Sequence, residues 1–269
     1  MKVKLKLSVI TLGLCVSALC YAGSTSDNAD PMVPTQQSVN FFKSQVAGGA
    51  SLSSALRGLL DRYPQKTTEF LSIALTAYPE SSKEIIMASV SAQPMFVDEI
   101  IMVANEFEVA QPTEIVEWAI NAEPSYASTA TRAACKYSPE FFNDIVKMAV
   151  TTEPDSADQI AQKLVNAYPS KTMEILITTI KEVPLVGKYV LDALLATVSE
   201  DEAKSEDMIL VSVEQLANYP DAIERLVELA KQHSVESDKI RMSAIKGGLS
   251  EEAIVAVINE HYDAAKPDS

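Results

Sequence analysis

The chain has 269 residues, of which 47% are hydrophobic, 22% are charged and 6% are aromatic. This composition excludes wholesale disorder, because the apolar residues suffice for a core. Acidic residues outnumber basic ones by 37 to 22, and the formal net charge is −15. Such a surface repels nucleic acid and anionic lipid and favours cationic partners, although a charge that merely keeps the protein soluble is the alternative.

The first 22 residues have the pattern of a secretory signal peptide. Three lysines (Lys2, Lys4 and Lys6) precede the uncharged stretch Leu7–Leu19, and Cys20-Tyr21-Ala22 offers a cleavage site after Ala22. The apolar run, about 16 residues, is shorter than the roughly 20 of a membrane-spanning helix. We expect an exported bacterial protein, periplasmic or secreted, with no membrane span after cleavage. Cleavage leaves a net charge of −18 and a single cysteine, Cys135.

Residues 23–34 are predicted to be a disordered leader, and residues 35–198 to be an array of helical repeats. The repeats are marked by prolines, which recur every fifteen residues at positions 64, 79, 94, 124, 139, 154, 169 and 184. One member is missing from this series. Val109 holds its place, and Pro112 follows three residues later.

Apolar residues recur in register with the prolines. Pairs such as Ile85-Ile86 and Ile100-Ile101 begin six residues after each proline, and mostly small residues such as Ala104 follow four residues later. Positions i, i+1, i+4 and i+5 form one helical stripe, and no strand alternation fits. Each unit is therefore predicted to be a helix of ten to twelve residues, about 16 Å long. Proline ends one helix and allows the next to begin just after it.

Helices this short need neighbours on both sides to be stable in water, and stacking supplies them. The sequence therefore predicts an all-α fold, an α-solenoid of short antiparallel helices with thirty residues per helical pair. In layout, roughly residues 49–198 resemble tetratricopeptide-like and related two-helix repeat proteins. The tetratricopeptide pattern of Trp, Leu-Gly and Tyr is absent and the period is shorter, so the resemblance implies a solenoid but no functional residue.

The period fails at an acidic insertion, residues 199–207, which reads SEDEAKSED. Helices are predicted to resume at about 208–218, 221–233, 237–246 and 250–262. Residues 208–264 then either cap the array or form a small second domain, and we expect them to continue it.

Few residues suggest catalysis or metal binding. The two histidines, His233 and His261, stand in different predicted helices and outside any known ligand pattern. Cys135 stands at a position of the fifteen-residue repeat that is filled mostly by Leu, Val and Ile in the other repeats. This indicates a small core residue rather than a nucleophile. Phosphate-binding, dinucleotide-binding and nucleophile motifs are absent. The sequence predicts neither a cofactor nor a metal site.

Two sets of residues are candidates for binding a partner. The first is a column of acids near the helix starts, which the helix dipole also favours for structural reasons; it contains Glu69, Glu84, Glu99, Glu114, Asp144 and Glu174. The second set is apolar and follows the repeated prolines, at positions where most repeats carry a pair of polar residues. Its members either pack against the next turn of the solenoid or anchor a partner; they are Met95, Phe96, Tyr126, Phe141, Phe142, Leu185 and Val186.

The leading functional hypothesis is a non-enzymatic scaffold that binds a protein or peptide, possibly a basic one, with apolar anchors and an acidic rim. One alternative is an envelope enzyme, such as a hydrolase, whose carboxylates converge only in three dimensions. The other is a carrier of apolar ligands, which requires a cavity between the helical layers.

Overall fold

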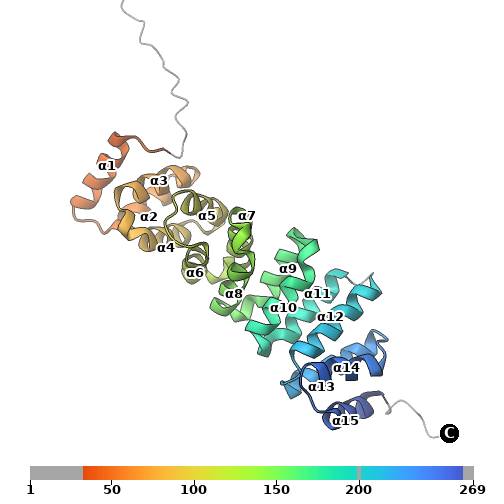
Figure 1. The fold of residues 1–269 in the computed structure, drawn as a ribbon. Coiled ribbons are helices and arrows are strands. Elements are labelled where there is room, and N and C mark those ends of the chain that lie inside the picture. Colours follow the sequence, from red (N-terminus) through yellow and green to blue (C-terminus); the bar gives the residue numbers. More distant parts are fainter. Residues whose placement is uncertain (1–32, 199–200, 263–269) are drawn as a thin grey trace, which may run out of the picture. The chain divides into compact units, whose positions relative to one another are not determined.

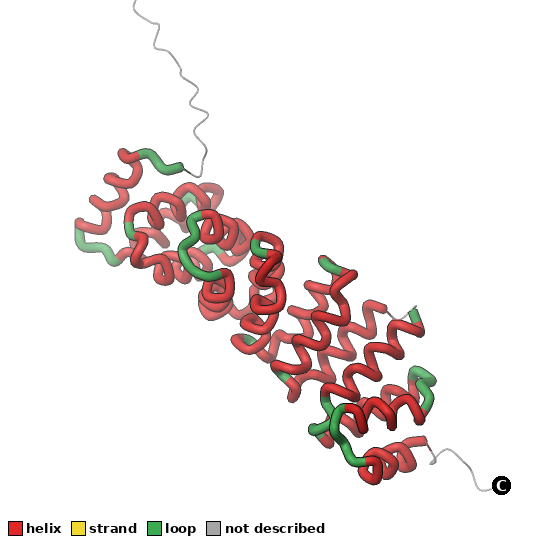
Figure 2. The backbone as a smooth tube through the Cα atoms, viewed as in Figure 1, coloured by secondary structure: helices red, strands yellow, loops and turns green. Residues whose placement is uncertain are grey.

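The structure is a computed structural model that describes residues 33–198 and 201–262 (Figure 1). The predicted signal peptide (residues 1–22) and most of the leader (residues 23–34) lie outside the described residues. Within the described ranges the chain forms fifteen α-helices and no strand (Figure 2). The α-helices are α1 (Gln36–Ala47), α2 (Leu52–Arg62), α3 (Thr67–Ala77), α4 (Ser82–Ala92), α5 (Val97–Glu106), α6 (Pro112–Ala122), α7 (Ala127–Tyr137), α8 (Phe142–Thr152), α9 (Ala157–Ala167), α10 (Thr172–Glu182), α11 (Gly187–Val198), α12 (Glu202–Gln215), α13 (Pro220–Gln232), α14 (Ser237–Lys246) and α15 (Glu251–Tyr262).

Each corner that the proline period predicts is a short 3₁₀ turn opened by the proline. The turns are η1 (Pro64–Lys66), η2 (Pro79–Ser81), η3 (Pro94–Phe96), η4 (Pro124–Tyr126), η5 (Pro139–Phe141), η6 (Pro154–Ser156), η7 (Pro169–Lys171) and η8 (Pro184–Val186). The residue before each of these prolines has φ between −152° and −131° and ψ between 61° and 88°, outside the helical region that proline disfavours for its predecessor.

The residue before each of these prolines joins two helices through its backbone hydrogen bonds. At the second corner the Tyr78 N–H donates to the Ala74 carbonyl at 2.9 Å and so ends α3. The Tyr78 carbonyl accepts from the Ser81 N–H at 3.0 Å and so opens the turn before α4. The proline itself contributes no N–H, and none is needed at this position. The expected helix-to-helix corner is therefore confirmed.

The helices form two layers that alternate along the chain. Each helix packs against the helices two before and two after it, so that α3, α5, α7, α9 and α11 form one layer. The helices α4, α6, α8 and α10 form the other layer. The predicted apolar columns lie between the layers: Ile85, Ile86 and Val90 of α4 are all 0% exposed. These observations confirm the α-solenoid.

Polar contacts also join helices two apart in the chain. The Ser91 hydroxyl at the end of α4 donates to the Ala122 carbonyl at the end of α6, at 3.2 Å. The Gln93 side chain donates to the Leu60 carbonyl near the end of α2, also at 3.2 Å. Because the carboxyl ends of these helices lie together, helices of one layer run in the same direction. Consecutive helices reverse only partly, and the axes of Pro79–Ala92 and Pro94–Glu106 turn by 117°.

The last four helices follow the same packing rule. α12 packs against α10 and α14, and α13 packs against α11 and α15. The helix expected to begin at about residue 208 begins earlier, at Glu202, and most of the acidic insertion is helical. Asp201 caps this helix by accepting from the Lys204 N–H at 3.1 Å, and acids in a first turn are favoured by the helix dipole.

Among the described residues no single helix is both long and apolar enough to cross a membrane. The bent pair Pro79–Ala92 and Pro94–Glu106 reaches the required length and apolarity only when the two helices are taken together.

Candidate functional site

The array is irregular at the corner between α5 and α6, where the proline series has its gap. α5 ends at Glu106, and Glu108 adopts φ of +49°, a left-handed conformation that is rare for a residue with a side chain. The Val109 N–H reaches back to the Ala104 carbonyl at 3.2 Å, a hydrogen bond that commonly closes a helix end of this type. The chain then needs a longer connection before α6 begins at Pro112.

A capping box starts α6. The Gln111 N–H donates to the Glu114 carboxylate at 3.2 Å, and the Gln111 carbonyl accepts from the Glu114 N–H at 2.9 Å. The predicted acid at this position therefore has a structural role, and its carboxylate is fixed against the first turn of the helix.

The longer corner leaves an open cleft of about 580 Å³. One wall comes from the end of α5, the loop and the first turn of α6, and the other wall comes from η5. The lining residues are Asn105, Glu108, Ala110, Gln111, Pro112, Glu114, Glu140 and Phe141. We call this feature the acidic cleft.

Asn105 holds the two walls of the acidic cleft together. Its side-chain amide donates to the Tyr137 carbonyl at 3.3 Å, and its side-chain oxygen accepts from the Ser138 hydroxyl at 2.6 Å. Ser138 is the residue that opens η5, since its carbonyl accepts from the Phe141 N–H at 3.1 Å. The pair Asn105–Ser138 therefore fixes where Glu140 and Phe141 lie relative to the end of α5.

The acidic cleft combines three carboxylates with one aromatic ring. Within the described ranges Glu108 and Glu140 have no ion pair with a basic side chain. Phe141 is half-buried, with one side packed on the core. In the part of the chain that the structure describes, no three His, Cys, Asp or Glu side chains are placed to hold a metal ion. The cleft therefore offers negative charge and an apolar wall, which together suit a cationic side chain.

The acidic cleft brings together one member of each predicted set of site residues, Glu114 and Phe141. Glu84, Glu114, Asp144 and Glu174 begin helices of the even-numbered layer, whereas Glu69 and Glu99 begin helices of the other layer.

Several of these acids also form ion pairs or hydrogen bonds with neighbouring side chains. Lys66 lies 3.0 Å from Glu69, and the Ser53 hydroxyl donates to Glu84. A hydrogen bond from Lys171 at 2.8 Å, opposed by partial burial, lowers the pKa of Glu174.

The apolar corner residues divide by exposure. Met95 and Leu185 are 71% and 83% exposed, whereas Phe96, Tyr126, Phe141 and Val186 are half-buried against the core. Phe142 is 4% exposed, and its ring meets that of Tyr168 edge to face at 5.3 Å. Its burial matches the packing alternative rather than the anchor alternative, because the first residue of each helix after a 3₁₀ turn points inward.

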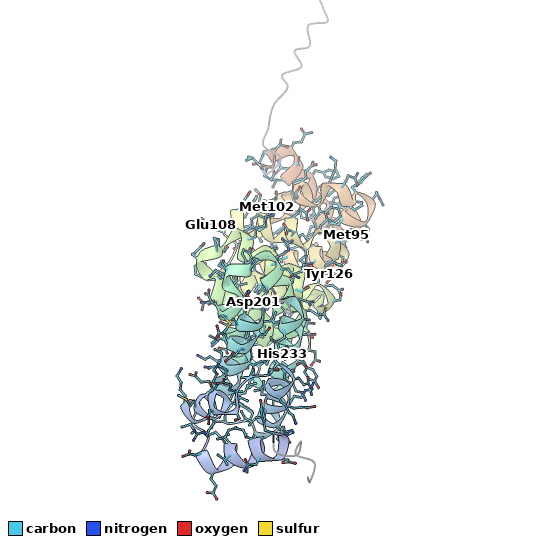
Figure 3. The ribbon with its side chains drawn as sticks, turned by 90° about the vertical axis from the view of Figure 1, so that its right-hand side faces the viewer. Met95, Met102, Glu108, Tyr126, Asp201 and His233 are labelled. Atoms are coloured by element: carbon cyan, nitrogen blue, oxygen red, sulfur yellow. The ribbon has the colours of Figure 1, made fainter. Side chains whose placement is uncertain are left out.

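The corners also divide by location. Met95, Phe96, Tyr126, Leu185 and Val186 all open helices of the odd-numbered layer. Figure 3 shows Met95 and Tyr126 on the opposite side of the array from Glu108. The corners at Met95 and Tyr126 therefore do not form a common surface with the acidic cleft.

Another polar cluster joins α5 to α7. Asp98 accepts from Arg132 at 2.6 Å and from the Tyr137 hydroxyl at 2.8 Å, and Lys136 lies 3.4 Å away. Burial opposes ionisation of Asp98, but the two hydrogen bonds and the charges of Arg132 and Lys136 outweigh it and lower its pKa. The charged and hydrogen-bonding groups of this cluster are paired with one another, so its role is to link α5 to α7.

Cys135 is fully buried, as its column predicts, and burial raises the pKa of its thiol to about 12 against the attraction of Lys171. A thiol in this environment is not a nucleophile at neutral pH. Sequence reasoning missed Asn105, Glu108, Gln111 and Glu140. One signal was available: Asn105 is a polar residue in an apolar column.

No known protein family, curated protein or solved structure matches this chain.

Proposed function

We propose that this chain is an exported helical-repeat scaffold that binds a basic segment of a partner protein or peptide at the acidic cleft, in the bacterial periplasm or outside the cell. One observation carries the proposal. The acidic cleft places Phe141 beside Glu108, Glu114 and Glu140, where the repeat is interrupted. Export is supported by the sequence pattern of residues 1–22 alone.

The chemistry of the acidic cleft favours a lysine or arginine flanked by apolar residues. The aliphatic part of such a side chain packs on the Phe141 ring, and its charge lies among the carboxylates. The net charge of the whole chain raises the encounter rate with a cationic partner, an effect that weakens with salt. The walls of the cleft are already held together by the hydrogen bonds of Asn105 to Tyr137 and Ser138, so binding needs little ordering of the protein.

The test uses a fluorescein-labelled peptide of alternating lysine and leucine, with binding to the purified chain followed by fluorescence anisotropy at low and high salt. Glu140→Lys and Phe141→Ser alter the acidic cleft. Asp155→Lys and Phe96→Ser are matched controls, because they occupy the same positions of the 3₁₀ turn at corners of the odd-numbered layer.

The cleft variants are expected to weaken binding by about three- to tenfold, as expected for exposed and partly exposed contacts, while the controls bind as the wild type does. Equal losses in both pairs would mean that the peptide is held by the general negative charge, and the proposal would be wrong. Phe141→Ser and Phe96→Ser both remove half-buried rings, so a common loss of stability is also controlled.

A further inference from the structure

A second depression lies on the odd-numbered layer, between the corner that opens α11 and the first turn of α13. It measures about 220 Å³ and is lined by Pro184, Leu185, Lys188, Tyr219, Pro220, Asp221 and Ala222. We call it the proline–tyrosine groove. Leu185 is 83% exposed and Tyr219 is 37% exposed. Tyr189, which follows Leu185 by one helical turn, is 56% exposed.

The groove suits an extended, proline-containing segment with an acidic residue beside it. Prolines, a leucine and a tyrosine make a shallow apolar surface of the kind on which polyproline II segments dock, because such segments are already ordered. Lys188 makes no ion pair among the described residues; its Nζ lies 4.9 Å from the centroid of the Tyr189 ring. The groove carries one charge of each sign, Lys188 and Asp221, and Lys188 is the one that attracts a carboxylate on the incoming segment.

This chain carries a segment of that chemistry. Pro31-Met32-Val33-Pro34 immediately precedes α1, and Asp30 adjoins it. Polyproline II has three residues per turn, so Pro31 and Pro34 fall on one side of such a segment. Asp30 then carries the charge opposite to that of Lys188.

The segment cannot reach the groove of its own chain. Pro31 lies five residues before Gln36, the first residue of α1, and five residues span at most about 18 Å. From α1 to α11, which carries the nearer wall of the groove, the odd-numbered layer has five helix-to-helix steps, about 40–50 Å at 8–10 Å each. The occupant must therefore come from a second copy.

We propose that residues 30–34 of one copy bind the proline–tyrosine groove of a second copy. The contact joins two different surfaces, so it is heterologous and links copies head to tail, either into a ring or into an open chain. It is independent of the acidic cleft and leaves that cleft free for another partner.

The test has a peptide arm and an assembly arm. A fluorescein-labelled peptide of residues 23–34 is titrated against the full chain carrying Pro31→Ala and Pro34→Ala, whose own leader no longer competes. Tyr219→Ala and Leu185→Ser are then added to the groove. Met95→Ser is the matched control, since Met95 occupies the same position of another corner and is 71% exposed, against 83% for Leu185.

The peptide is expected to bind, to lose at least tenfold in affinity with Tyr219→Ala or Leu185→Ser, and to be unaffected by Met95→Ser. In sedimentation, the wild-type chain is expected to form larger species as its concentration rises, and the Pro31→Ala, Pro34→Ala chain to stay monomeric. A peptide that does not bind, or association that persists without the two prolines, would overturn the proposal. Glu140→Lys is expected to change neither the binding of the leader peptide nor the sedimentation of the chain. A failure of this proposal is therefore distinguishable from a failure of the acidic cleft.

Discussion

Glu108 holds a strained position in the acidic cleft, and replacing it should separate stability from binding. At three helix ends, a residue with left-handed backbone is followed by a residue whose N–H donates to the carbonyl five residues before it. The donors Val109, Val235 and Leu249 reach Ala104, Ala230 and Ala244 at 3.2, 2.9 and 3.0 Å. Their left-handed residues are Glu108 at φ +49°, Ser234 at φ +58° and Gly248 at φ +102°. Only the third is glycine, the residue that adopts this conformation without strain.

We predict that Glu108→Gly stabilises the chain. Relief of the left-handed strain is worth about 1–2 kcal/mol, and the extra freedom of glycine in the unfolded chain offsets about 0.4–1 kcal/mol. The net gain in the free energy of unfolding is centred at ~0.8 kcal/mol within a range of about 0–1.6 kcal/mol, and the central value corresponds to an increase of about 2–3 °C in Tm for a chain of this size. The same change removes one carboxylate from the acidic cleft, so affinity for the lysine–leucine peptide should fall.

Two control variants make the comparison decisive. Ser234→Gly should give the same stabilisation with unchanged peptide affinity, because Ser234 lies outside the cleft. Glu108→Gln keeps the side chain but not the charge, so it should weaken binding without the backbone gain. Urea unfolding followed by circular dichroism measures stability, and anisotropy measures affinity. If Glu108→Gly destabilised the chain while Ser234→Gly stabilised it, the strain argument at the cleft would be refuted.

Three further predictions concern groups inside the array. Thr179→Val should raise the free energy of unfolding by about 1 kcal/mol in urea titrations, because its buried hydroxyl has no hydrogen-bond partner among the described residues; Thr131→Val should not, since that hydroxyl donates to Ala127 at 2.7 Å. Asp98→Asn should cost about 1–2 kcal/mol at neutral pH. Because folding lowers the pKa of Asp98, its contribution is complete above the ordinary value of 3.8 and is lost as pH falls below it, so acid titration should destabilise the wild type more than Asp98→Asn. Cys135, with its pKa raised to about 12, should resist iodoacetamide at pH 8 until urea exposes it, and rapid labelling of the native chain would contradict its burial.

The fold was largely readable because its signal is local and repeated. Proline at fixed intervals dictates each corner, and the paired apolar residues that follow dictate which side of each helix is buried. Where the local signal weakens, the prediction loses accuracy. The start of α12 was placed too late because charges in SEDEAKSED suggest a solvated insertion, whereas the same acids are favourable in the first turn of a helix.

The acidic cleft was harder to predict because its walls are thirty residues apart. The period implies that helices two apart are neighbours, so Asn105 and Ser138 could have been paired. Which side chains face the opening depends on the left-handed turn at Glu108. The sequence has no glycine there that would predict such a turn. Phe142 could not be assigned to one of its two alternatives from the sequence. Its apolarity was visible, but its inward direction follows from the length of the 3₁₀ turn before it.

Hydrogen exchange of the chain with and without a bound basic partner tests the central claim most directly. Binding at the acidic cleft should slow exchange at the backbone amides of Phe107–Glu114 and of Glu140–Asp144, and leave the corners at Met95 and Leu185 unchanged. Protection at those odd-layer corners without protection at the α5–α6 loop would contradict the assignment of the cleft as the binding site.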